Sequence, residues 1–292
     1  MAITPTEKRS VLAARIRNRE LLTAPGVYDM ISLRIADRLD HPALYMTGYG
    51  TVASYLGLPD AGLASYTDMV HRAGQMAAGS ATPIIADADT GYGGLLNVQH
   101  TVRGYENAGI AAIQIEDQEF PKKCGHTPGR RVIERADMVD KIRVACEART
   151  DANFLIVART DARTTLGLDE AITRALAYHE AGADVIFVES PESDEEFAAI
   201  AAAIDAPLLA NMVEGGRSPI LSPERLRELG FAVAIYPGTG MNAAAAALEK
   251  TYRCIAKTES SVALDTPLYP IADMHNLMGF DAVWDFDKKW AE

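Results

Sequence analysis

Residues 120–131, FPKKCGHTPGRR, place several positive charges around one thiol. The basic side chains of this stretch are Lys122, Lys123, Arg130 and Arg131. The thiol is Cys124, and His126 follows it by two residues. Because nearby positive charge favours a thiolate, Cys124 is a candidate general acid that exchanges a proton near neutral pH. A nucleophile and a zinc ligand are the alternative roles, although the sequence offers no cluster with zinc-ligand spacing.

The same stretch has the composition of a loop. Its prolines and glycines, which include Gly125, Pro128 and Gly129, disfavour a regular helix. We expect this loop to close over a bound substrate and to exclude water from it. An ordinary mobile loop is the alternative.

Two aspartates form a second candidate group. Asp87 and Asp89 lie two residues apart in IIADADTGYGG, at residues 84–94, so on a strand they point to one face. Two carboxylates this close share either a proton or a cation. Oxygen ligands in small number favour Mg2+, with Mn2+ as the alternative, and Glu116 at the end of the next strand is a further outer partner. The competing interpretation is an acidic turn at a solvated strand end.

Arg159 is the basic residue of the same predicted site. A guanidinium at a strand end binds a carboxylate through two parallel hydrogen bonds. Together with a cation on the aspartates, Arg159 predicts a pocket for a small anionic carboxylate substrate. Glu189 and Asn211 are expected to position this substrate. Alternatively, Arg159 pairs only with a carboxylate of the protein, such as Glu189 or Asp161.

Eight short apolar segments alternate with stretches of helical periodicity, which predicts βα units. The predicted strands are residues 24–29, 43–48, 83–89, 111–117, 154–160, 184–190, 207–212 and 231–237. Helices are expected at 134–149, 168–181 and 239–257. The nearly continuous apolar segments indicate strands covered on both faces, so we predict an α/β fold of the (β/α)8 TIM-barrel type. A doubly wound sheet is the alternative, but no Gly-x-Gly-x-x-Gly turn follows the first strand. In a barrel the polar residues that follow the strands meet at one face.

Length and composition favour one globular enzyme-sized domain. The 292 residues contain no linker or repeat, so we predict a single barrel domain over 1–292 that ends in a helical extension at about 258–292. With 28 basic and 40 acidic residues the net charge is −12, which disfavours nucleic acid and anionic membrane surfaces as partners. No apolar segment is long enough to span a membrane and no signal peptide is found. The odd number of cysteines indicates reduced thiols and a cytoplasmic protein, with Cys146 and Cys254 buried in helices.

Five motifs resemble the isocitrate lyase/phosphoenolpyruvate mutase superfamily. They are KKCGH at 122–126, DADTGYG at 87–93, IEDQ at 115–118, ARTDAR at 158–163 and NMVEGG at 211–216. The resemblance covers about residues 20–255, with the motifs in family order. The KKCGH loop is similar to that of the carbon–carbon lyase members, the 2-methylisocitrate and 2,3-dimethylmalate lyases. Membership implies a (β/α)8 barrel, dependence on Mg2+ and a homotetramer in which C-terminal helices are exchanged between subunits.

The resemblance also implies roles for individual residues. Asp87 and Asp89 match the metal-site aspartates, with Glu116 behind them through water. Cys124 matches the catalytic cysteine, and Tyr45 and Arg159 are further catalytic candidates. Substrate-binding roles are implied for Thr47, Gly48, Tyr49, Asp60, Gly125, His126, Arg159, Glu189 and Asn211. The implied reaction is a reverse aldol-type cleavage of a 2-hydroxy acid, which releases an α-keto acid, with Cys124 protonating the other fragment.

One segment departs from the pattern of the tricarboxylate lyases. Residues 236–245, YPGTGMNAAA, have no arginine near Asn242 for a third carboxylate. We therefore expect a dicarboxylate such as an alkylmalate as readily as 2-methylisocitrate, and Tyr49 is expected to fill the pocket. A carboxyphosphonate-processing mutase and an oxaloacetate-cleaving enzyme are the alternative activities. A barrel that only binds ligand is the non-enzymatic alternative.

Overall fold

The computed structural model describes residues 3–125 and 127–291. Eight parallel strands form a closed barrel in sequence order, and β8 pairs with β1 through Leu22 and Val233. The strands are β1 (Leu22–Val27), β2 (Leu44–Met46), β3 (Ile84–Asp87), β4 (Ala112–Glu116), β5 (Leu155–Thr160), β6 (Val185–Val188), β7 (Leu208–Asn211) and β8 (Phe231–Tyr236). This closure confirms the predicted (β/α)8 barrel and excludes the open doubly wound sheet.

The strands are apolar throughout because both of their faces are buried. In β5, Leu155 and Val157 belong to one hydrophobic cluster, whereas Ile156 and Ala158 belong to a second one. Since successive side chains of a strand point to opposite faces, one cluster fills the barrel and the other packs under the helices. Each strand is thus fixed from both sides, which holds the residues at its carboxyl end in place.

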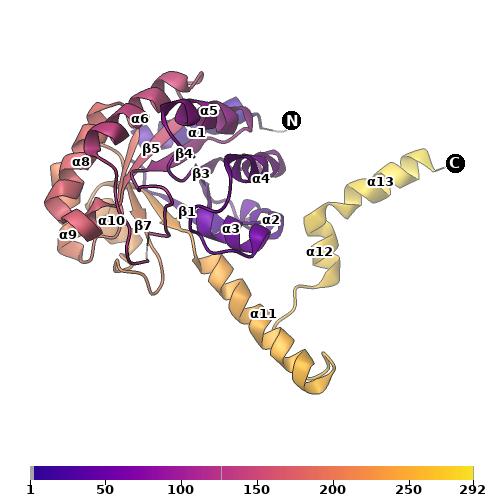
Figure 1. Ribbon diagram of the computed structural model, residues 1–292. Coiled ribbons are helices and arrows are strands. Elements are labelled where there is room, and N and C mark those ends of the chain that lie inside the picture. Colours follow the sequence, from indigo (N-terminus) through magenta and orange to yellow (C-terminus); the bar gives the residue numbers. More distant parts are fainter. Residues whose placement is uncertain (1–2, 126, 292) are drawn as a thin grey trace. The chain divides into compact units, whose positions relative to one another are not determined.

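Helices surround the barrel strands (Figure 1). They are α1 (Pro5–Arg17), α2 (Met30–Asp37), α3 (Gly48–Leu56), α4 (Tyr66–Gly79), α5 (Leu95–Asn107), α6 (Arg135–Ala148), α7 (Ala162–Leu166), α8 (Leu168–Glu180), α9 (Asp194–Ala203) and α10 (Pro223–Glu228). Several begin at side chains that accept a backbone N–H, as Ser65 does at the start of α4. The predicted helices at 134–149 and 168–181 correspond to α6 and α8.

The chain divides into two compact units, one up to Thr239 and one from Gly240 onward. The second unit contains α11 (Thr239–Thr258), α12 (Ile271–Met278) and α13 (Phe280–Trp290). The helix predicted at 239–257 is α11. The single domain with a helical extension at about 258–292 stays a prediction. Exchange of these helices between subunits stays a prediction.

The cysteines are free thiols, but two of them are less buried than expected. Cys146 and Cys254 are both half-buried, so the prediction that they are buried was wrong. Cys146 packs against the edge of the hydrophobic core, and its Sγ lies 3.2 Å from the carbonyl oxygen of Gly182. Among the residues that the structure describes, no helix is both long and apolar enough to cross a membrane.

Candidate active site

Polar residues from six strands meet at the carboxyl end of the barrel. They are Thr47 after β2, Asp87 at the end of β3, Glu116 at the end of β4, Arg159 near the end of β5, Glu189 after β6 and Asn211 at the end of β7. Each of these side chains is buried. Since carboxyl ends of barrel strands form the active-site face of this fold, the cluster is the candidate active site.

Lys122 of the KKCGH loop forms ion pairs with two aspartates of the site, Asp89 and Asp60. Nζ of Lys122 is 2.5 Å from Oδ1 of Asp89 and 2.5 Å from Oδ1 of Asp60. Burial raises the pKa of Asp89 to about 7, while the Lys122 ammonium opposes this shift. Burial lowers the pKa of Lys122, but the surrounding carboxylates outweigh it and raise that pKa well above its ordinary value. Lys122 is therefore a cation that neutralises the acidic pair, a role that the sequence analysis did not assign to it.

Local backbone geometry ties the main chain of Asp89 to the carboxylate of Asp87. The φ angle of Asp89 is 48°, a left-handed conformation that costs a residue with a side chain of order 1 kcal/mol. The N–H of Asp89 donates to Oδ1 of Asp87 at 2.9 Å. Gly48 lies against the other oxygen of Asp87, where a Cβ would overlap it. The glycine predicted at the substrate site is thus required by the close approach of α3 to this carboxylate.

The acidic group fits a divalent cation held partly by water. Oε1 of Glu116 is buried and has no hydrogen-bond partner within the described part of the chain. No group of three His, Cys, Asp or Glu side chains in residues 3–125 and 127–291 converges closely enough to hold a metal ion alone. Mg2+ commonly binds through one or two carboxylates and keeps several waters, so the oxygens of Asp87 and Asp89, with Glu116 behind them, suit this ion.

Arg159 lies among three carboxylates. Its Nε and Nη2 donate to the two oxygens of Asp161 at 2.8 and 2.9 Å. Nη2 also lies 3.1 Å from Oε2 of Glu189, and Nε lies 3.4 Å from Oε2 of Glu116. Asn211 donates through Nδ2 to the same oxygen of Glu189 at 3.1 Å. Arg159 thus pairs with protein carboxylates, and these contacts fix its orientation at the barrel mouth, while its binding of a substrate carboxylate stays a prediction.

The loop that carries Cys124 lies directly on this cluster. The N–H of Cys124 donates to the carbonyl of Asp60 at 3.1 Å, and Oγ of Ser190 donates to the carbonyl of Gly125 at 3.4 Å. A Cβ on Gly125 would overlap Nη2 of Arg159 and crowd the carboxylate of Glu189. The loop thus covers the Arg159 region, and its closure over a substrate stays a prediction. The substrate-binding role of His126 falls outside the described residues.

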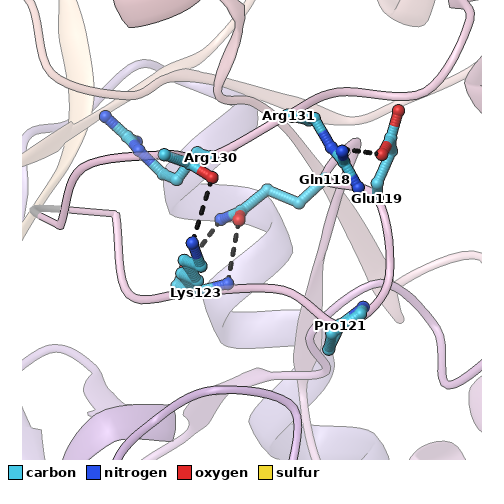
Figure 2. A pocket seen from close by; sticks show the side chains of 7 residues that line it. Gln118, Glu119, Pro121, Lys123, Arg130 and Arg131 are labelled. Carbon is cyan, nitrogen blue, oxygen red and sulfur yellow. Dashed lines mark hydrogen bonds and ion pairs between the residues drawn. The ribbon is translucent and has the colours of Figure 1, made fainter.

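The cations of the loop all have acceptors, as Figure 2 shows for two of them. Lys123 donates through Nζ to the carbonyl of Gly129 at 3.2 Å, and Arg131 pairs with Glu119 at 2.7 Å. Arg130 pairs with Asp161. A cavity of about 280 Å3 lies beside this part of the loop. The positive charge that we interpreted as acting on the thiol is engaged in holding the loop and in neutralising carboxylates.

Sequence reasoning missed Gln114, which joins two of the predicted residues. The hydroxyl of Tyr45 donates to Oε1 of Gln114 at 2.7 Å, and Nε2 of Gln114 lies 3.4 Å from Oδ1 of Asp87. The sequence could have indicated Gln114, because it precedes Glu116 by two residues on β4 and its side chain therefore points to the same face. The side chain of Tyr49, by contrast, is 43% exposed. The structure therefore gives no support to the prediction that Tyr49 fills the pocket.

The chain matches the phosphoenolpyruvate phosphomutase family over residues 12–256. It is 44% identical over 283 residues to a 2,3-dimethylmalate lyase of Eubacterium barkeri, which covers 96% of this chain and 98% of that protein. It is 42% identical over 282 residues to a 2-methylisocitrate lyase of Aeropyrum pernix, with coverage of 97% and 90%.

Solved structures show the same relationship. An oxaloacetate acetylhydrolase bound to 3,3-difluorooxalacetate superposes with a TM-score of 0.92 at 36% identity, over 98% of both chains. A phosphonopyruvate hydrolase in complex with oxalate and Mg2+ superposes with a TM-score of 0.88 at 27% identity, over 99% of this chain and 100% of that one. Relatives of this extent and identity share the fold. This chain is therefore an enzyme of the phosphoenolpyruvate phosphomutase family.

Proposed function

We propose that this enzyme is a Mg2+-dependent carbon–carbon lyase that cleaves a 2-hydroxy di- or tricarboxylate into an α-keto acid and a carboxylic acid. The observation that carries the proposal is the position of Arg159, buried at the barrel mouth between the acidic group and the loop of Cys124. The similarity to a 2,3-dimethylmalate lyase supports this reaction. Since no arginine lies near Asn242 for a third carboxylate, 2,3-dimethylmalate is the substrate that we favour over 2-methylisocitrate.

Asp87 and Asp89 would hold the divalent ion, Mg2+ or alternatively Mn2+, with Glu116 linked through water. When bound, this ion would polarise the hydroxyl and carboxylate oxygens of the substrate. Arg159, beside Glu116, and Lys122, beside Asp89, offset part of the negative charge of this group. Together with the bound ion, these cations would offset the charge of the carboxylates and so allow a dianionic substrate to bind.

Arg159 would bind one carboxylate of the substrate through its planar guanidinium. Thr47, Gly48, Glu189 and Asn211 would position the remaining oxygens. Tyr45 lies further into the barrel, where burial holds its pKa well above the ordinary value, so its hydroxyl stays protonated. Tyr45 therefore acts as a hydrogen-bond donor through Gln114 rather than as a base.

The C2–C3 bond of 2,3-dimethylmalate would break with its electron pair moving to C3. The hydroxyl would give its proton to a nearby carboxylate, and from there to solvent, as it becomes the keto group of pyruvate, and C3 would become the carbanion of propionate. Cys124 would donate the thiol proton to this carbanion, and solvent would restore the thiol. Asp60, Gly125 and Ser190 hold the loop over the cluster, which keeps water away from the carbanion until protonation.

For the assembly, we propose a homotetramer in the cytoplasm with exchanged C-terminal helices. None of the described residues of α11 and α13 is buried. Large apolar side chains such as Trp284 and Phe286 are exposed on α13, and burial against another subunit would remove them from water. The net charge of −12 disfavours nucleic acid as a partner.

Hydrolysis of oxaloacetate is a second candidate, because an oxaloacetate acetylhydrolase superposes with a TM-score of 0.92. The two reactions differ in their products. An oxaloacetate hydrolase releases oxalate and acetate, whereas the proposed lyase releases an α-keto acid. A phosphonate mutase would instead form a carbon–phosphorus bond, which phosphorus NMR detects.

A panel of substrates tests the proposal. Purified protein is incubated with Mg2+ and, separately, with alkylmalates, 2-methylisocitrate, isocitrate and oxaloacetate, and release of keto acid and of oxalate is followed. We expect 2,3-dimethylmalate to give equal amounts of pyruvate and propionate. Release of oxalate from oxaloacetate, without cleavage of any 2-hydroxy acid, would show a hydrolase in place of the proposed lyase. Absence of cleavage of every 2-hydroxy acid tested would overturn the proposal.

A further inference from the structure

Asp161 binds two guanidinium groups that come from different parts of the chain. Arg159 donates to both of its oxygens, at 2.8 and 2.9 Å, and Nη1 of Arg130 pairs with Oδ1. The side chain of Asp161 is fully buried, and that of Arg130 is 1% exposed. Because water screens charges weakly in such a place, each of these ion pairs acts strongly on the others.

The position of Asp161 is fixed by its backbone. Its N–H donates to Oδ1 of Asp117 at 2.9 Å, and the side chain of Asp117 is itself held by Thr160 at 2.7 Å and Tyr178 at 2.7 Å. Arg130 is fixed from its other side, since its Nη2 donates to Oγ1 of Thr164 at 2.6 Å. Asp161 and Arg130 therefore form a rigid pair behind Arg159.

The charges around Arg159 give this pair a function. Arg159 contacts the carboxylates of Asp161, Glu189 and Glu116, so three carboxyl groups compete for its single guanidinium. Burial alone would raise the pKa of Asp161, but Arg159 and Arg130 outweigh it and lower that pKa below its ordinary value. Asp161 is thus an anion whose charge is shared by two cations.

We propose that Arg130 is a positioning residue for substrate binding, which neutralises Asp161 so that Arg159 remains available to a carboxylate of the substrate. The inference rests on the proposed function, in which Arg159 binds that carboxylate. Without Arg130, Asp161 would hold Arg159 more tightly and would add an uncompensated negative charge to the pocket. The two effects act in the same direction and weaken the binding of an anion.

The neighbouring arginine provides a matched control. The side chain of Arg131 is 75% exposed and pairs with Glu119, away from Asp161. R130Q and R131Q remove one positive charge each from adjacent positions, so a general effect of net charge or of the loop sequence is the same in both. Only R130Q leaves a buried carboxylate without its second cation.

The experiment measures the binding of two probes by calorimetry, Mg2+ alone and oxalate in the presence of saturating Mg2+. We expect R130Q to weaken oxalate binding by about tenfold or more, the order expected when a charge-assisted hydrogen bond is lost. Binding of Mg2+ should stay the same or become tighter, because the pocket gains negative charge. In turnover, KM should rise by a larger factor than kcat falls. R131Q should match the wild type in all of these measurements.

Two further variants separate charge from packing. R130K keeps the positive charge but loses the forked geometry, and T164V removes the second contact of Arg130 while keeping its charge. Both should retain most of the oxalate affinity that R130Q loses, and they serve if R130Q does not fold. The inference would be overturned if R130K bound oxalate as weakly as R130Q does. It would also be overturned if R130Q bound oxalate as tightly as R131Q does. Parallel loss of Mg2+ and oxalate binding in R130Q would show a structural defect instead and would also overturn it. A wild-type enzyme that binds Mg2+ but no oxalate would overturn the proposed function itself, and this inference with it.

Discussion

At the scale of single residues, the proposed reaction depends on Cys124 as the proton donor. The backbone N–H of Cys124 donates to the carbonyl of Asp60, and this hydrogen bond fixes the position of the main chain that carries the thiol. Cys124→Ser keeps the size of the side chain but makes it a far weaker acid, and we expect turnover to fall by about 10²–10⁴, the contribution typical of a general acid. The measurement is keto-acid release, with Cys254→Ser in α11 as the control. Full turnover of Cys124→Ser would refute the role of proton donor.

Cys146 gives a prediction about pH. Burial raises the pKa of its thiol to about 11 from an ordinary value of 9.0. Since the folded protein disfavours the thiolate, the free energy of unfolding loses a contribution as the pH rises from about 9 to about 11. Alkylation of Cys146, followed by peptide mass spectrometry, should therefore be slow at pH 8 and accelerate toward pH 11. Labelling at pH 8 as fast as in the denatured protein would contradict this.

Some residues of the site could be predicted from the sequence and others could not. Asp87, Asp89 and Arg159 follow apolar segments, so the barrel topology alone places them at one mouth. The contact of Lys122 with Asp89 joins a loop to a strand end, and no spacing in the sequence encodes such a distance. The basic composition of the loop indicated a cationic environment for Cys124, whereas the structure gives these cations to carboxylates and carbonyl oxygens.

At the scale of elements, the loop over the cluster requires a glycine at position 125. A Cβ there would overlap Arg159, so we expect Gly125→Ala to prevent the loop from closing and to reduce turnover by at least about tenfold, without loss of the fold. Gly94→Ala is the matched control, because nothing lies within 4 Å of a Cβ at Gly94. The measurements are turnover and the melting temperature of both variants. Equal turnover in the two variants would contradict a closed loop in catalysis.

The strands were predictable because their sequence pattern has a single physical cause. Burial on both faces requires continuous apolar residues, as in β5 and β6, and Gly or polar residues then end each strand. The helical unit was harder to delimit. α11 follows β8 with only two residues between them, and its helical periodicity continues that of a barrel unit, so the sequence indicated no boundary at Thr239.

At the scale of the whole molecule, the closed barrel brings together residues from six strands, and the C-terminal helices expose apolar side chains. Sedimentation velocity tests the proposed assembly directly, since a homotetramer has four times the mass of one chain. Substitution of exposed Trp284 by Lys should shift the protein to smaller species if α13 packs between subunits. Val262→Lys, at a position that is 94% exposed in the segment between α11 and α12, is the control that should leave the mass unchanged.

The dependence of cleavage on Mg2+ tests the central claim most directly. Product formation from 2,3-dimethylmalate is followed by proton NMR in the enzyme as purified, after chelation, and after return of Mg2+. The account predicts pyruvate and propionate in equal amounts, loss of both on chelation, and recovery with Mg2+ in the wild type but not in Asp89→Asn. Undiminished cleavage after complete removal of divalent ions would contradict it.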